Sequence, residues 1–161
     1  MELRIREAKP DEHELLTKIS FAAKRYWDYP REYFDIWKDE LTISEEYIRD
    51  NVVFVAKTKS RVSAYYSIVH VEQEFFAGDT KVEKGYWLEH MFVLPEHIGK
   101  GVGAAMYLHA RQYCRDNGID ALMIFADPNA KGFYEKMGAQ YIEERPSGIA
   151  GRSVSLFIDM L

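Results

Sequence analysis

The segment from residue 86 to residue 126 constrains the fold most, because it combines a strand, a glycine-rich loop, a helix and a second strand. "YWLEHMFV" is apolar and aromatic, as strands are, and glycines follow at positions 99, 101 and 103. Apolar residues then recur at helical spacing up to Asn117-Gly118, before the continuous apolar run "ALMIFA". Such a run is typical of a buried central strand. The segment therefore predicts a strand–helix–strand crossover in a sheet flanked by helices.

The remaining sequence adds antiparallel elements to this crossover. "LRIREA" alternates as a strand does, and helical patterns follow up to residue 50. "VVFVAK" and "VSAYYSIVHVEQEF" are rich in β-branched and aromatic residues, and "AQYIEE" and "RSVSLFIDML" are expected as the last strands. The 161 residues suit a single domain, so we expect an α/β fold over residues 1–161 with a mixed, mostly antiparallel sheet.

Composition narrows the possible partners. The formal net charge of -5 argues against nucleic acid, whose phosphates require a basic surface. Cys114 is the one cysteine, so no disulfide framework is possible and a reducing compartment is expected. No apolar run is long enough to cross a bilayer, and the histidines lack metal-ligand spacing. We expect a cytoplasmic protein that uses no metal and binds neither membrane nor nucleic acid.

The glycine loop has the features of a phosphate cradle. A helix N-terminus exposes unpaired N–H groups with partial positive charge, and glycine lets a ligand approach them. A P-loop is excluded, because Lys100 is followed by Gly101 rather than by serine or threonine. A dinucleotide fingerprint is met only loosely by Gly99, Gly101 and Ala104, since the chain has one crossover unit and Asp120 begins the next strand. Lys100 either adds charge at the rim or faces solvent.

Two separated motifs resemble those of the GNAT acyltransferase superfamily. "VLPEHIGKGVGAAM" is similar to its acyl-CoA pyrophosphate loop, and "ALMIFADPNAKGFYEKMGA" to its following strand and its N-A-x-x-F-Y-E-K-x-G helix. The resemblance implies a GNAT-like fold whose sheet is splayed where acyl-CoA binds, with acetyl-CoA as co-substrate. One position departs from the pattern: Ile98 stands where the superfamily usually has arginine or glutamine, which implies weaker diphosphate binding.

The resemblance also implies which residues hold the cofactor. The backbone of the strand from His90 to Val93 would pair with the pantetheine amides, as in β-augmentation. Asn129 either hydrogen-bonds the pantetheine or belongs only to the first helical turn after Asp127, which is expected to cap that helix. The expected cofactor-binding residues are Met91, Phe92, Val93, Ile98, Gly99, Lys100, Gly101, Val102, Gly103, Ala104, Asn129 and Tyr134.

Three residues are candidates for catalysis. Tyr134 stands where the superfamily places a tyrosine near the coenzyme sulfur, so its hydroxyl would donate to the departing thiolate; its position also suits a core tyrosine. Glu89 and His90 are adjacent on one strand and point to opposite faces. Glu89 is the preferred base for activating the amine, and His90 is the reserve. A structural ion pair for Glu89 and a structural hydrogen-bonding role for His90 are the alternatives. Cys114 is not expected to be the nucleophile.

The acceptor would bind beside the N-terminal helices, which are the superfamily's variable part. Trp27 and Tyr29 belong to an aromatic segment, "KRYWDYPREYFDIWKDEL", that would cradle a cationic amine or simply pack onto the sheet. Arg152, in the turn before the last strand, would hold a carboxylate or face solvent. The resemblance implies direct transfer of acetyl from acetyl-CoA to a primary amine of a small molecule or peptide in a ternary complex. Dimers are common in the superfamily, so both a monomer and a homodimer are compatible with the resemblance. A catalytically silent acyl-CoA sensor and a dinucleotide-dependent enzyme are the alternatives.

Overall fold

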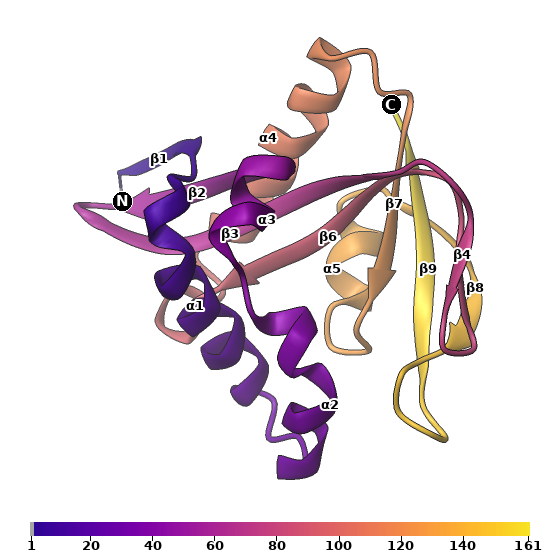
Figure 1. The fold of residues 1–161 in the computed structure, drawn as a ribbon. Helices are drawn as coiled ribbons and strands as arrows, with labels where there is room; N and C mark the ends of the chain where they lie inside the picture. Colours follow the sequence, from indigo (N-terminus) through magenta and orange to yellow (C-terminus); the bar gives the residue numbers. More distant parts are fainter. Residues whose placement is uncertain (1) are drawn as a thin grey trace. The chain divides into compact units, whose positions relative to one another are not determined.

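The computed structural model describes residues 2–161, and Figure 1 shows its helices and strands. In order they are β1 (Leu3–Glu7), η1 (Pro10–Glu12), α1 (His13–Arg25), α2 (Arg31–Leu41), α3 (Glu45–Asp50), β2 (Val52–Thr58), β3 (Arg61–Val71), β4 (Phe75–Ala77), β5 (Thr80–Val82), β6 (Gly85–Val93), η2 (Pro95–His97), α4 (Val102–Asp116), β7 (Ala121–Ala126), α5 (Lys131–Lys136), β8 (Gln140–Pro146) and β9 (Ser153–Met160).

The strands form a seven-stranded sheet in the order β1-β2-β3-β6-β7-β9-β8, and β4 and β5 form a separate two-stranded sheet. Strands β6 and β7 are parallel, as the crossover through α4 requires, whereas β1–β2, β2–β3, β7–β9 and β8–β9 are antiparallel. The expected fold class, an α/β fold with a mixed sheet flanked by helices, is confirmed. The chain forms two compact units: residues up to Ile68 with His90–Ala110, and Val69–Glu89 with Arg111–Leu161.

The first unit has helices on both faces of its strands, because side chains alternate along β2. Val53 and Val55 face the apolar side chains of α1 and α3, in a cluster that also holds Leu16, Ile19, Ile48 and Tyr65. Phe54 faces the other way, where its ring lies 4.7 Å from that of His109 on α4. Figure 1 shows α1 and α3 beside β2 and β3 within this unit.

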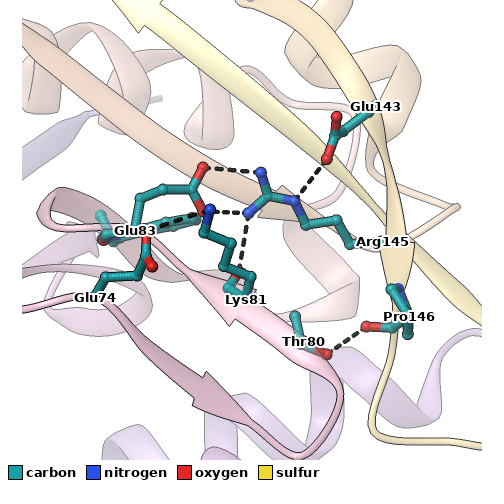
Figure 2. A network of polar contacts seen from close by, with 8 residues as sticks. Glu74, Thr80, Lys81, Glu83, Glu143, Arg145 and Pro146 are labelled. Carbon is teal, nitrogen blue, oxygen red and sulfur yellow. Dashed lines mark hydrogen bonds and ion pairs between the residues drawn. The ribbon is translucent and has the colours of Figure 1, made fainter.

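The second unit contains β7, which pairs with β9 along its full length. Gly85 begins β6 in this unit with a φ of 135°, and a Cβ there would lie 2.5 Å from the terminal methyl of Met123. No side-chain-bearing residue adopts that φ without strain. Arg145 of β8 holds the β4–β5 hairpin: its guanidinium contacts both carboxylate oxygens of Glu83 and bonds Glu143 at 3.0 Å (Figure 2). The Thr80 hydroxyl donates to the Pro146 carbonyl in the same network.

Three expected boundaries differ from the observed ones. The strand expected to run to Phe75 ends at Val71, and the strand expected over "AQYIEE" extends to Pro146. The helix expected from Asp127 begins at Lys131 instead. The reason is local: the Asp127 carboxylate accepts the backbone N–H of Asn129 at 2.9 Å, so it closes a turn before the helix rather than capping the helix itself.

Candidate active site

The glycine loop of the first unit has an unusual backbone. Gly99 and Gly101 have φ angles of 79° and 83°, and Lys100 between them is not in this left-handed region. Alternation of this kind is typical of backbone that binds anions, although the Lys100 N–H itself donates to the His97 carbonyl at 3.4 Å. A Cβ at either glycine would have no atom of the chain within 4 Å, so both face open space. The loop is thus accessible to a ligand.

The loop leads directly into α4. The first intrahelical hydrogen bond runs from the Ala105 N–H to the Gly101 carbonyl at 3.0 Å. By helix geometry, the N–H groups of Val102, Gly103 and Ala104 therefore precede the first intrahelical bond. Val102 anchors this end, since its side chain is only 1% exposed. These N–H groups lie at the N-terminal end of a helix of 15 residues, and the dipole of that helix favours an anion at this end.

The loop rim carries two exposed side chains. Ile98 is 39% exposed, so it presents an apolar surface where the superfamily usually has a cationic or amide side chain. Lys100 is exposed as well and supplies the positive charge at this rim. The backbone, rather than a set of side chains, is therefore the main donor group of the loop.

Strand β6 precedes the loop. Its parallel ladder with β7 consists of Trp87 opposite Met123 and Leu88 opposite Ile124. Met91, Phe92 and Val93 form the last part of β6 and are half-buried. The Leu94 N–H then donates to the Ser63 carbonyl at 2.8 Å, which fixes the exit of β6 toward η2.

Glu89 and His90 have opposite environments on β6. Glu89 is exposed, whereas His90 is 3% exposed. The His90 Nε2 lies 2.8 Å from the Glu40 carbonyl oxygen, and Nδ1 lies 2.8 Å from the Ser67 hydroxyl and 3.2 Å from the Tyr47 hydroxyl. Both ring nitrogens of His90 are engaged inside the protein.

Tyr134 lies in the second unit, on α5, and is 7% exposed. Its ring packs against those of Phe133 and Phe157, with centroids 5.2 and 6.1 Å away. Burial raises the pKa of the Tyr134 phenol well above its usual range. The hydroxyl therefore keeps its proton at any pH at which the protein works.

Asn129 and Arg152 also lie in the second unit. The Asn129 side-chain amide donates to the Asp127 carboxylate at 3.2 Å, so both residues belong to the turn before α5. Arg152 lies in the turn between β8 and β9, where its carbonyl accepts the Ser147 N–H at 3.0 Å. Its side chain is partly exposed.

In the first unit, a lysine of the chain itself already lies over two rings of the aromatic segment. The Lys24 ammonium lies 4.3 Å from the Trp37 ring centroid and 5.6 Å from that of Tyr29, and Tyr29 and Trp37 meet edge to face. Trp27, by contrast, is 44% exposed in the turn after α1. The sequence pattern indicated an aromatic cluster but not that Lys24 would lie on it, because helix spacing does not reveal contacts between two helices.

The buried network of Tyr47, Ser67 and His90 was also missed from the sequence. The three residues come from α3, β3 and β6. They are far apart in the sequence, and no pattern in a single sequence indicates that they are in contact. Over residues 2–161, no three His, Cys, Asp or Glu side chains are grouped as metal ligands, and none of the described helices combines the length and apolarity that a bilayer-spanning segment needs.

Comparisons with known proteins give a family from the sequence and similar folds among solved structures. Residues 20–139 match the model of the Acetyltransferase (GNAT) family. Among solved structures, the chain is similar to the PaiA N-acetyltransferase of Thermoplasma acidophilum in complex with coenzyme A, with a TM-score of 0.78, 17% identity and full coverage of both chains. No curated protein sequence matches.

Two further structures share the fold. A GNAT family acetyltransferase of Brucella melitensis in complex with acetyl-CoA has a TM-score of 0.59 and 21% identity, over 86% of this chain and 83% of that one. The ribosomal-protein-S18-alanine N-acetyltransferase of Escherichia coli has a TM-score of 0.66 and 14% identity, over 98% and 91%. With the family model covering most of the sequence, this chain belongs to the GNAT acetyltransferase family and is an acyltransferase.

Proposed function

We propose that the protein is an acetyl-CoA-dependent N-acetyltransferase that acetylates a primary amine of a small molecule or peptide by direct attack in a ternary complex. The observation that carries the proposal is the open, left-handed backbone of Gly99 and Gly101 at the start of α4. Membership of the family supports it, as do two similar structures that contain coenzyme A or acetyl-CoA. Residues 1–161 would act as one catalytic domain.

The loop would bind the diphosphate of coenzyme A. The N–H groups of Gly101, Val102, Gly103 and Ala104 would donate to its oxygens, assisted by the helix dipole, whereas the Lys100 N–H already donates to the His97 carbonyl at 3.4 Å. The exposed ammonium of Lys100 would add a charge attraction to the diphosphate that solvent screens, and the apolar side chain of Ile98 would add no such attraction. The backbone of Met91, Phe92 and Val93, beyond the two pairs of the β6–β7 ladder, would pair with the pantetheine amides. In the second unit, the Asn129 amide is the side chain we assign to the pantetheine arm.

Glu89 is the residue we assign as the base. An ammonium has no lone pair, so the acceptor must lose a proton before its nitrogen can attack the thioester carbon. The exposed carboxylate of Glu89 can take that proton directly or through water. His90 is less suited to this step, because it is buried and both its ring nitrogens have partners within the protein.

Tyr134 is the residue we assign to the departing thiolate. As the tetrahedral intermediate collapses, the carbon–sulfur bond breaks and negative charge gathers on sulfur. The Tyr134 hydroxyl, kept protonated by burial, would donate a hydrogen bond to that sulfur. Trp27, Tyr29 and Arg152 are the side chains we assign to the acceptor. Since Lys24 already lies on Tyr29, the exposed ring of Trp27 is the better surface for a new ligand.

A matched pair of alanine variants tests the cofactor site. Gly101 precedes the first residue of α4 and Gly118 follows the end of the helix, and both have positive φ and open space around a built Cβ. Alanine at either position costs about 1–2 kcal/mol of backbone strain, so both variants should lose similar stability. Only Gly101→Ala should weaken coenzyme A binding, by at least tenfold in calorimetry. Equal affinities in the two variants would refute the diphosphate site.

Turnover is tested separately. Acetyl-CoA is mixed with a panel of amines, and free thiol is followed with a chromogenic disulfide. Thiol release that depends on both the amine and Glu89 supports the transferase. Tight binding of coenzyme A with no release on any amine would instead indicate a silent acyl-CoA sensor, and stronger thermal stabilisation by NAD(P) than by coenzyme A would indicate a dinucleotide enzyme.

A further inference from the structure

His90 connects two elements that serve different parts of the proposed site. Its Nε2 lies 2.8 Å from the carbonyl oxygen of Glu40, in the last turn of α2. Carbonyls in the last turn of a helix have no partner within the helix. The Lys38 carbonyl is satisfied by Thr42, through its N–H at 3.0 Å and its hydroxyl at 2.6 Å. For the Glu40 carbonyl, the donor comes from strand β6.

The direction of these hydrogen bonds fixes the tautomer of the ring. A carbonyl oxygen only accepts, so the His90 Nε2 carries the hydrogen. In the neutral imidazole, Nδ1 is then an acceptor, and the Ser67 hydroxyl donates to it at 2.8 Å. Ser67 in turn accepts from the Tyr47 hydroxyl at 2.9 Å and from the His90 backbone N–H at 3.1 Å. The chain of donors runs from α3 through the ring to α2.

The surroundings hold the ring in this orientation. His90 is 3% exposed, and the rings of Tyr47, Tyr65 and Phe92 lie with their centroids 5.5, 5.9 and 6.1 Å from its own. A rotation of the ring would break the hydrogen bond between the buried Nδ1 and the Ser67 hydroxyl. Buried polar groups without partners are costly, so the arrangement is strongly preferred.

We propose that His90 is a positioning residue: its Nε2–H holds the C-terminal end of α2, one of the N-terminal helices beside which the acceptor would bind, to the strand whose next three residues would hold the pantetheine arm. This inference rests on the proposed function. It assigns His90 a role other than proton transfer, because the one basic lone pair of the neutral ring is bound by Ser67. Removing the contact should affect the acceptor more than the cofactor.

Two amide variants separate the two ends of the ring. The side chain of His90→Gln is long enough to place an N–H near the Glu40 carbonyl. His90→Asn keeps an acceptor near the Nδ1 position for Ser67 but is too short to reach Glu40. Neither variant can take up a proton. We therefore expect the glutamine variant to keep the KM for the acceptor amine within about twofold, and the asparagine variant to raise it about tenfold, the effect of one lost hydrogen bond.

The same measurements include the outcome that would overturn the proposal. The KM for acetyl-CoA and the affinity for coenzyme A should stay unchanged in both variants, which also shows that they are folded. If both variants lose kcat equally and the pH–rate profile loses its basic-group limb, His90 is the base and the proposal is wrong.

A second readout does not depend on turnover. Amide hydrogen exchange is measured in the last turn of α2, including the Thr42 N–H that bonds Lys38. His90→Asn should lose protection there and His90→Gln should retain it, whether or not an acceptor is found. If the unaltered protein releases no thiol with any amine, that result contradicts the proposed transferase activity but not the proposed role of His90. Unchanged protection in His90→Asn would overturn the role of His90.

Discussion

At the scale of single residues, burial decides which side chains keep their protons. Tyr134 and Cys114 are both buried, and burial disfavours the charged form of a phenol or a thiol. Burial, together with the charge of Asp159, raises the pKa of the Cys114 thiol to about 11. For Tyr134 a retained proton suits a donor role, whereas for Cys114 it makes the side chain chemically inert.

Cys114 should therefore resist modification in the folded protein. With a thiol-specific reagent at pH 7.5, we expect labelling at least a hundredfold slower than in the urea-unfolded chain, because the thiolate is the reactive form. Mass spectrometry over time measures the rate. Labelling as fast as that of a free thiol would show that the helix surface around Cys114 is open.

Replacement of Tyr134 should affect catalysis more than cofactor binding. Tyr134→Phe retains the ring contacts with Phe133 and Phe157 and removes only the hydroxyl. If that hydroxyl serves the departing thiolate, kcat should fall roughly ten- to a thousandfold, the range of a lost transition-state donor. Steady-state kinetics and the dissociation constant of coenzyme A are measured together. A normal kcat would leave Tyr134 a purely structural residue.

At the scale of elements, cation–aromatic contacts join α1 to α2, and an ion pair joins the β4–β5 hairpin to β8. Hydrophobic periodicity in the sequence does not reveal either contact. Helix α1 ends with Lys24 and Arg25, and both cations lie over aromatic rings: Lys24 over Trp37 and Tyr29, Arg25 over Phe34 and Phe21. The β4–β5 hairpin depends instead on Arg145. Hydrogen bonding to Arg145 keeps the pKa of the Glu83 carboxyl below its usual range.

The contact between α1 and α2 can be weighed with matched variants. Lys24→Met removes the ammonium but keeps most of the apolar stem, and should lower the free energy of unfolding by about 0.5–1 kcal/mol. Lys18→Met, at an exposed position on the same helix, is the control and should be near neutral. Urea unfolding measures both. Equal values for the two would mean that the Lys24 contact adds nothing.

The hairpin should depend on the fork of the Arg145 guanidinium. Arg145→Lys keeps the charge but cannot bond both Glu83 oxygens and Glu143 at once, so we expect a loss of about 1–3 kcal/mol. Glu143→Gln changes only the more exposed partner and should cost less than 1 kcal/mol. Thermal unfolding compares them, and amide exchange in β4 and β5 shows whether the loss is local.

Elements with a clear period were predicted well, and contacts between distant segments were not. The run "ALMIFA" coincides with β7, and the helix after the glycines ends where Asn117-Gly118 predicted. The β4–β5 hairpin was missed because its strands have 3 residues each, too few for an alternating pattern to be recognised. The opposite faces of Glu89 and His90 followed from strand geometry, but the partners of His90 lie 23 or more residues away.

At the scale of the whole molecule, the free energy of unfolding should depend on pH. As the pH is lowered, His109 should contribute first and three carboxylates at lower pH. The Nδ1 of His109 on α4 is hydrogen-bonded to the Tyr66 hydroxyl, 2.7 Å away, and its ring meets that of Phe54 edge to face. Burial lowers the pKa of His109 below its usual value of 6.5. The pKa values of Glu12, Glu83 and Glu144 are also lowered, by their hydrogen bonds.

The sign of the effect follows from proton binding. Below pH 6.5 the unfolded chain takes up a proton at His109 before the folded protein does, so the free energy of unfolding falls as the pH falls. The three carboxylates add a second loss, as the pH passes below their usual value of 4.5 toward their folded pKa values. Urea unfolding between pH 7.5 and 5 should show the first slope, and His109→Gln should flatten it. An unchanged slope would assign it to other groups.

Gly85 bears on how β6 is aligned with its neighbour. Its φ of 135° strains any residue that carries a side chain, and an added Cβ would also displace the flexible end of Met123, so the sheet contains a notch that favours glycine. Slippage of β6 along β7 would bring Lys84 or Tyr86 into that notch. A shift by a single residue would also exchange the faces of Glu89 and His90, burying the carboxylate and exposing the imidazole. A glycine with no chemistry of its own thus sets the register on which the assignment of base and positioning residue depends.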